Sequence, residues 1–417
     1  MQSVGRVVGR AVKGMFAGGS TPARLRMWMV LTAVFAVGLG VLGATGLGRR
    51  DNALHDARDA SAQLIDVQRV QVSLVGAAAL ATENYLRGGP EDAEQRAQYV
   101  TELADASSGL VAVSNKVPAQ EAELLRAAAD GLTKYAGLVE QARANNRQGF
   151  PIGAAYLRAA NEAASADVAI LRSVQASLRE QVNDDLDRAE AAGVWLHLAG
   201  WPLLLLLLLG GAWMARRFRR MVNVPLAAGA IAAFAVLAAV GGVQASAMSD
   251  AEDAVDGPLL SADLAAQALS AAYDARTHEL LTLINRGNGA ADEAAWGQSS
   301  AVAALALTQL CDLSADCAEI EEFRAVVDAH TDLREMDDGG DWDAAKDTSL
   351  TGNARIQFNR FTRDIELTSD GHATTAANAL ADAPGGVQGA RVVVFLAGLV
   401  VAALVLIGYG RRLREYR

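Results

Sequence analysis

The sequence contains little of what sheets, metal sites and redox sites need. Of its 417 residues, two are cysteine, eight are proline and five are histidine, while aromatic residues make up 5%. Few aromatic residues in an alanine-rich, proline-poor chain favour long helices over strands. The histidines show no paired spacing of the kind that metal ligands need: His55, His197, His278, His330 and His372. We therefore expect an all-α protein without metal or other cofactor, and we interpret the histidines as ordinary surface or interfacial residues.

Motifs of catalysis are missing as well. No nucleophile elbow and no kinase motif occurs, so we assign no catalytic residue and expect no enzyme. One stretch, Gly38–Gly43, matches the GxGxxG dinucleotide-binding pattern by letters alone. It lies in an apolar run and lacks the preceding strand that the pattern requires. Its small residues instead favour close packing between membrane helices.

Four apolar runs are long enough to cross a bilayer core of about 30 Å, which takes about 20 residues. They are Met27–Leu47, Val194–Ala215, Pro225–Met248 and Val392–Gly410. The first follows basic residues, as a secretory signal does, but its apolar run is too long and no clear cleavage site follows, so we expect it to be retained. No ionisable residue lies in the middle of a run, which disfavours a transporter or channel.

Basic residues cluster beside these runs. The clusters are Arg216, Arg217, Arg219 and Arg220 in the link between the second and third runs, and Arg411, Arg412 and Arg414 after the fourth. By the positive-inside rule, these segments and the basic N-terminal tail face the cytoplasm, so the chain is a multi-pass plasma-membrane protein with both termini inside. The arginines are candidate contacts for lipid headgroups or a cytoplasmic partner.

The expected organisation follows from the spans and their orientation. Its parts are a basic cytoplasmic segment (1–26), transmembrane helix 1 (27–48), a first extracytoplasmic helical bundle (49–193), transmembrane helix 2 (194–215), a basic cytoplasmic link (216–224), transmembrane helix 3 (225–248), a second, acidic bundle (249–391), transmembrane helix 4 (392–410) and a basic cytoplasmic tail (411–417). The cytoplasmic parts are too short to bury a core, so any output is expected to pass to a separate polypeptide.

Helix punctuation divides the first outside segment into four. Gly88-Gly89-Pro90, Lys116-Val117-Pro118 and Gly149-Phe150-Pro151 each place proline where a helix can begin. Helices are predicted near 51–86, 91–115, 119–147 and 152–190, with apolar residues at three- and four-residue intervals, as in a four-helix bundle. No breaker separates the outer helices from the spans, so we expect them to run on into the membrane.

The second outside segment repeats this plan. ALATENYLRGG at Ala79–Gly89 and HELLTLINRGN at His278–Asn288 both end a first long helix, which indicates a tandem span-bundle-span repeat or a chance likeness of two alanine-rich bundles. The segments differ in charge: 49–193 has 21 acidic and 15 basic residues, whereas 249–391 has 26 and 9. The acidic surface favours solubility or, alternatively, a basic partner or cations.

The two cysteines, Cys311 and Cys317, both fall in the second outside segment. An oxidising compartment favours a disulfide between them. The loop that it closes is short, so it is expected to hold local geometry and to contribute only about 2 kcal/mol.

Several segments resemble the GlnX-type membrane signalling proteins of actinobacteria. These are STPARLR at Ser20–Arg26, ENYLRGG at Glu83–Gly89 and ARTHELLTLINRG at Ala275–Gly287, together with the doubled layout of span and bundle. The resemblance implies two protein partners: a GlnH-like extracytoplasmic lipoprotein that binds glutamate, aspartate or glutamine, and a PknG-like cytoplasmic Ser/Thr kinase. The chain is then a signal relay between them. Membrane lipid is a further partner, a homodimer stays open, and no nucleic acid is expected.

Two other functions stay open. One is direct small-molecule sensing by a bundle of the chemoreceptor type, in which Arg69, Arg87 or Arg276 holds a carboxylate. The other is a structural or scaffold protein of the cell envelope. Bundles that continue into spans resemble those of chemoreceptors and sensor kinases, but neither a HAMP linker nor an output domain follows either bundle here.

Overall fold

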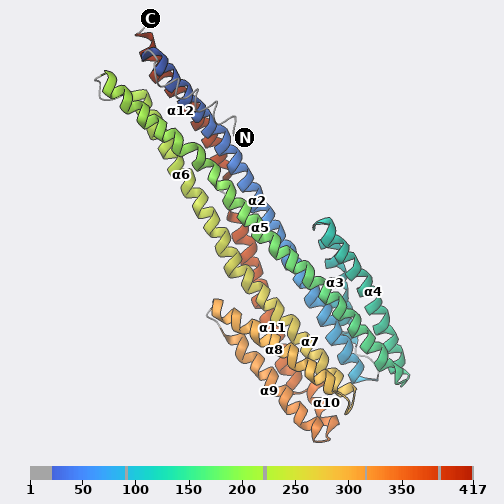
Figure 1. The fold of residues 1–417 in the computed structure, drawn as a ribbon. Helices are drawn as coiled ribbons and strands as arrows, with labels where there is room; N and C mark the ends of the chain where they lie inside the picture. The colour runs from blue at the N-terminus through green and yellow to red at the C-terminus, as the bar shows by residue number, and fades with distance from the viewer. Residues whose placement is uncertain (1–20, 90–92, 219–222, 315–316, 384–386, 416–417) are drawn as a thin grey trace, which may run out of the picture. The chain divides into compact units, whose positions relative to one another are not determined.

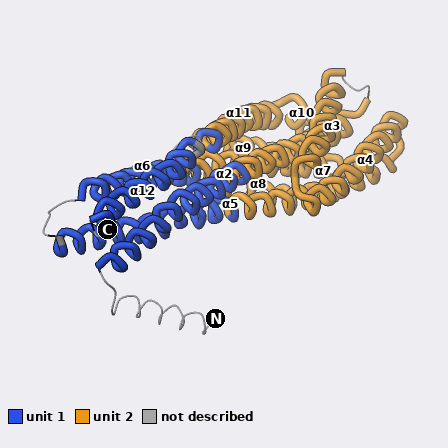
Figure 2. Tube along the Cα trace, turned by 90° about the horizontal axis from the view of Figure 1, so that it is seen from above, with its two compact units in different colours: residues 1–56, 184–252, 380–417 blue, residues 57–183, 253–379 orange. Residues whose placement is uncertain are grey.

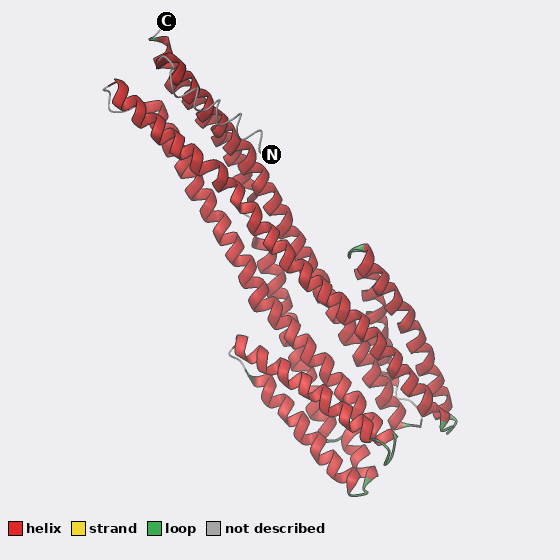
Figure 3. Ribbon diagram, in the orientation of Figure 1, coloured by secondary structure: helices red, strands yellow, loops and turns green. Residues whose placement is uncertain are grey.

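The structure is a computed structural model that describes residues 21–89, 93–218, 223–314, 317–383 and 387–415. Within these ranges the regular structure is helical and no strand occurs, which confirms the all-α class (Figure 3). The basic N-terminal segment up to residue 20, as well as Arg219 and Arg220, lies outside the described residues.

The helices follow one another with short connections (Figure 1). They are α2 (Thr21–Arg87), α3 (Ala93–Ser114), α4 (Ala119–Arg147), α5 (Ile152–Phe218), α6 (Val224–Ala254), the π-helix η1 (Val255–Leu259), α7 (Leu260–Ile284), α8 (Ala290–Ser314), α9 (Ala318–Asp338), α10 (Trp342–Leu350), α11 (Asn353–Asp382) and α12 (Val387–Arg414). The breaks up to α5 fall where glycine and proline predicted them. Gly88 and Gly149 both have positive φ, which a residue without Cβ adopts at little cost where a helix ends.

Among the described residues, four helices are long and apolar enough to cross a membrane, as predicted. They are Thr21–Arg87, Ile152–Arg217, Val224–Ile284 and Gly389–Arg414. The predicted continuation of the outer helices is confirmed, because α2 and α5 each run for 67 residues without a break. Between α6 and α7, Pro258 lies in the π-helix, whose wider turn tolerates a residue without an N–H.

The chain divides into two compact units (Figure 2). Unit 1 comprises residues 1–56, 184–252 and 380–417, and unit 2 comprises residues 57–183 and 253–379. The apolar ends of the four span helices pack around one core in unit 1. There, a Cβ on Gly398 would lie 2.6 Å from Gly40 Cα, so α2 and α12 approach closely through glycine. This contact confirms the packing role expected of the glycine-rich stretch.

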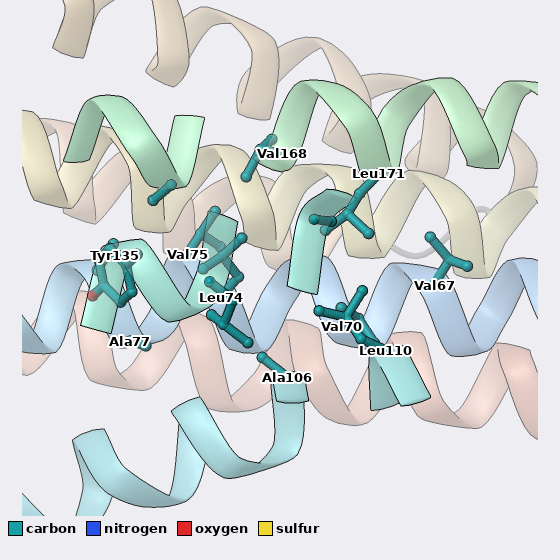
Figure 4. Close-up of a cluster of buried hydrophobic side chains, with 14 of the residues drawn as sticks. Val67, Val70, Leu74, Val75, Ala77, Ala106, Leu110, Tyr135, Val168 and Leu171 are labelled. Carbon is teal, nitrogen blue, oxygen red and sulfur yellow. The ribbon is translucent and has the colours of Figure 1, made fainter. Parts of the chain in front are cut away.

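Within unit 2, residues 57–183 form what we call the first bundle, and residues 253–379 form the second bundle. The first bundle encloses an apolar core from α2, α3, α4 and α5, which includes Val70, Leu110, Tyr135 and Leu171 (Figure 4). Tyr135 and Leu171 are fully buried. Burial of one such side chain stabilises the fold by about 1.5–3 kcal/mol, so this core dominates the stability of the bundle.

The second bundle has a core of its own from α7, α8, α9 and α11, with Phe361 and Ile365 fully buried. It contains the additional short helix α10, which Asp341 caps by accepting a hydrogen bond from the Ala344 N–H at 3.1 Å. Cys311 and Cys317 form a disulfide with their Cα atoms 4.9 Å apart, as predicted.

Candidate functional site

The two bundles meet along α2 and α5 of the first and α7 and α11 of the second; we call this contact the junction. Apolar clusters lie near both ends of it. In one, Ile65 packs with Leu259 and Ala376; in the other, Leu157 packs with Leu281. These clusters hold the bundles together within unit 2. Between them lie polar contacts, together with Val72 and Tyr273, each of which packs against the core of the other bundle.

Glutamine and arginine side chains form the polar part of the junction near the cluster that contains Ile65 and Leu259. Gln68 and Arg179 both donate hydrogen bonds to the carboxylate of Asp263. Gln71 donates to Ser270 Oγ at 2.7 Å and accepts from Gln175 Nε2 at 3.0 Å. Gln68, Gln71 and Gln175 are buried, so these bonds satisfy groups that would otherwise be costly to remove from water.

Farther along the junction, three arginines surround one buried carboxylate. Glu83 of α2 pairs with Arg87 Nη2 at 3.3 Å, with Arg276 Nη2 of α7 at 3.6 Å, and with Arg355 of α11. We call these four residues the Glu83 cluster. Burial lowers the pKa of Arg355. Arg87 lies on the same helix as Glu83, whereas Arg276 and Arg355 belong to the second bundle. The contact is specific, because Arg276 and Arg355 would lose this carboxylate if the bundles separated.

The network continues from Arg276 into the second bundle. Arg276 is only 4% exposed, and it donates to the carboxylate of Glu279 and to the Ser349 carbonyl oxygen, the latter at 2.5 Å. Burial alone would raise the pKa of Glu279, but the charge of Arg276 and the bonds from His330 and Ser349 outweigh it, so the pKa is lowered. Glu279 is therefore a charged carboxylate in the interior.

His330 extends this network to the far side of the second bundle. Its Nδ1 lies 3.0 Å from Glu279 Oε2 and its Nε2 lies 3.2 Å from Glu293 Oε1, while the ring stacks on Trp296 at 3.5 Å. Arg334 Nε lies 3.3 Å from the same Glu293. The interpretation of His330 as an ordinary surface or interfacial residue is wrong, since it is 2% exposed and bound at both ring nitrogens.

The three arginines proposed to hold a carboxylate are in different situations. Arg87 and Arg276 both hold Glu83. Arg69 is exposed and pairs with Asp66 and Asp370. All three therefore bind carboxylates of the protein itself.

Four aspartates, Asp337, Asp338, Asp341 and Asp343, lie close together in the sequence where α9 ends and α10 begins. Arg334 pairs with Asp337 at 2.5 Å and with Asp338 at 2.7 Å. The described ranges contain no group of three or more His, Cys, Asp or Glu residues arranged to hold a metal ion.

The basic residues proposed to contact lipid or a partner gather at one end of unit 1. Those described are Arg216 and Arg217 in the last turn of α5, and Arg411, Arg412 and Arg414 in the last turn of α12. Arg217 donates to Thr21 Oγ1 at 3.4 Å, where α2 begins. Asn223 donates to the Gly408 carbonyl at 3.1 Å, which brings the start of α6 to the end of α12. Since only a short link separates α5 from α6, these helix ends lie together.

Sequence reasoning missed Glu83, Glu279 and Arg355, although a signal for the first two was present. Glu83 lies in ENYLRGG, and Glu279 lies in ARTHELLTLINRG with Arg276. The sequence indicates that these two segments occupy equivalent positions in two repeats. In the structure they also contact each other, because Arg276 binds Glu83.

A family model matches part of the chain. Residues 53–191 match the family model of the actinobacterial sensor domain, a range that contains the first bundle. No curated protein and no solved structure matches the chain. With four helices able to cross a membrane, the match supports a helical membrane protein with a signalling role, whose residues 53–191 are similar to the actinobacterial sensor domain.

Proposed function

We propose that this protein relays a signal across the plasma membrane, from an extracytoplasmic amino-acid-binding lipoprotein of the GlnH type to a cytoplasmic Ser/Thr kinase of the PknG type. In this proposal both bundles lie outside, and the arginines at the helix ends lie in the cytoplasm, in line with the positive-inside rule. The chain itself carries out no reaction.

The observation that carries the proposal is the junction. Its polar centre lies on helices, α2 and α5, that also contain candidate spans. Ion pairs and amide hydrogen bonds can exchange partners without opening an apolar core, so a junction of this kind can have two packings of similar free energy. A protein that binds one packing better shifts the population towards it.

The identity of the partners rests on the resemblance to GlnX-type proteins and on the sensor-domain match of residues 53–191. The arginines at the ends of α5 and α12 are the surface proposed for the kinase or for anionic lipid. The surface of the acidic second bundle is complementary in charge to a basic face of the lipoprotein.

The test is a crosslinking pull-down of the full chain from membranes of the native host, with and without added glutamate or aspartate. We expect to recover a solute-binding lipoprotein and a soluble kinase, with a yield that depends on the amino acid. Recovery of the chain alone would overturn the relay and favour the scaffold function.

Two variants sharpen this test. Glu83→Gln removes the charge that holds Arg87, Arg276 and Arg355, and is expected to keep the lipoprotein but abolish the effect of the amino acid on kinase recovery. Glu321→Gln changes an exposed ion pair with Arg324 on α9 and should behave like the unaltered chain. An unchanged amino-acid effect in Glu83→Gln would show that the junction does not carry the signal.

A further inference from the structure

A cavity of about 290 Å³ lies in the junction beside the Glu83 cluster. Residues of both bundles line it, from α2 and α3 of the first and from α7 and α11 of the second, among them Glu83, Glu102, Tyr273, Arg276, Arg355 and Glu366. Its volume is at the small end of ligand pockets, which suits a metabolite rather than a large cofactor.

One side of the cavity carries two carboxylates without a cation. Glu102 of α3 and Glu366 of α11 form no ion pair within 4 Å with any residue in the described ranges. The pKa of Glu102 is raised, first by burial and then by the charge of Glu366, against a hydrogen bond from Ser73. Burial also raises the pKa of Glu366, and the charge of Asp370 adds to it. A cation between the two carboxylates would relieve this repulsion.

The wall beside these carboxylates is aromatic. Tyr273 and Phe358 meet edge to face, with ring centroids 5.5 Å apart, and both line the cavity. Aromatic faces next to carboxylates attract organic cations more than bare metal ions, because the ring replaces water around the alkyl part of the cation.

The other side of the cavity offers donors. Arg276 lines the cavity and is only 4% exposed. Its Nε is buried and has no hydrogen-bond partner. A buried donor without a partner costs free energy unless a ligand or water accepts from it. Arg355 lines the same side. An anionic group on a ligand could therefore be bound here.

We propose that this cavity binds a small organic ammonium compound directly, with its ammonium group between Glu102 and Glu366 and against Tyr273. The arginine side of the cavity distinguishes two classes of ammonium ligand, plain amines and amino acids. A plain amine uses the carboxylates only, whereas an amino acid also places its carboxylate at Arg276 and Arg355. This site goes beyond the proposed relay, because it needs no binding protein.

Such a ligand would join the two bundles. Glu102 belongs to the first bundle and Glu366 to the second, so an ammonium group bound by both favours the packing in which they are close. Occupancy of the cavity and docking of a partner would then act on the same junction.

The experiment is isothermal titration calorimetry of the full chain in lipid nanodiscs, in an amine-free phosphate buffer, with putrescine and with L-ornithine. The two probes share their diamine part and differ by one carboxylate. We expect saturable binding of at least one probe. If ornithine binds more tightly by about tenfold or more, the ligand class is an amino acid. If both probes bind equally, the ligand class is a plain amine.

Variants test the position of the site. Glu102→Gln and Glu366→Gln keep the shape of the side chain, remove one charge from the cavity wall, and should each weaken binding by about tenfold or more. Glu321→Gln, exposed on α9 and absent from the cavity, should bind as the unaltered chain does. The absence of binding at millimolar probe, or unchanged binding in both cavity variants, would overturn the proposal. The relay could still hold in that case, since the pull-down tests it separately.

Discussion

Inside the first bundle the helices meet through leucine, valine and alanine, whereas at the junction buried glutamine, arginine and glutamate meet beside apolar contacts. The apolar core is non-directional, and its free energy depends on the area removed from water. The polar contacts are directional, and each depends on a particular partner. The core therefore maintains the bundle, while the junction determines how one bundle meets the other.

The core and the junction therefore have different roles: the core provides stability, and the junction can rearrange. A packed core loses several kcal/mol when one side chain is removed, so it does not tolerate rearrangement during signalling. A buried ion network contributes less net stability than its contacts imply, because desolvation of the charges offsets their attraction. Four substitutions or treatments test the contrast, in order of decreasing expected effect.

The largest effect is expected for Arg276→Met. The change leaves Glu279 and Glu83 buried without this cation, which costs about 3–5 kcal/mol for a buried pair broken on one side. Hydrogen exchange of the full chain in nanodiscs should show loss of protection in α7 and α10, while α4 stays protected. Arg324→Met, whose arginine is exposed and pairs with Glu321, should cost less than about 0.5 kcal/mol. A loss in Arg276→Met no larger than in this control would contradict the structural importance of the network.

Leu171→Ala should have the next largest effect. It leaves a cavity in the fully buried core of the first bundle and costs about 3 kcal/mol, within the range of about 2–5 for such changes. Protection should fall in α3, α4 and α5 before it falls in α8 and α9. Val111→Ala, at an exposed position of α3, is the matched control and should be close to neutral. Equal loss of protection in both bundles would mean that the junction is as rigid as the core.

Loss of the disulfide should cost about 2 kcal/mol. Cys311 and Cys317 are six positions apart, and so short a loop restricts the unfolded chain only modestly. The effect should be confined to α8 and α9 in a Cys311→Ser, Cys317→Ser double variant, followed by the same exchange experiment. A change of protection in α2 would show that this loop is coupled to the junction.

The smallest effect is a pH dependence that arises inside the first bundle. Burial raises the pKa of Asp167 to about 6, against the charge of Lys134. An unfolded aspartate titrates near about 3.9, so the contribution of this group to stability is full below about pH 4 and is lost as the pH rises through about 6. Asp167→Asn should therefore stabilise the protein by about 1–2 kcal/mol at about pH 8 and not at about pH 4.

Thermal unfolding at both pH values measures this effect. Asp130→Asn, at an exposed position of α4, is the control and should change stability equally little at both. If Asp167→Asn stabilises the chain equally at the two pH values, the titration of Asp167 is not the cause.

The helices of the first bundle could be predicted because their ends depend on local chemistry. Pro118 directly precedes α4, and Gly88 and Gly149 take positive φ where α2 and α4 end. The extra helix α10 was not predicted, since it has only nine residues and no apolar repeat long enough to show a period.

The junction could not be derived in the same way, because its partners are far apart in the chain. Arg276 binds Glu83 from the other bundle, and His330 binds Glu279 from another helix. The sequence suggested Arg276 as a residue that holds the carboxylate of a ligand, and no local pattern indicated its pairs with Glu83 and Glu279 of the protein itself. A lone histidine in the sequence likewise gives no sign of the two glutamates beside it.

In the proposed relay, the junction changes its packing when the lipoprotein has bound its amino acid. The direct measurement is the distance between spin labels on Val111→Cys of α3 and Leu367→Cys of α11, both exposed, by pulsed electron resonance on the full chain in nanodiscs. The native cysteines form a disulfide and are not labelled. With the lipoprotein recovered by crosslinking, we expect different distance distributions for the amino-acid-loaded and the empty partner. Identical distributions, with binding of the lipoprotein verified, would contradict it.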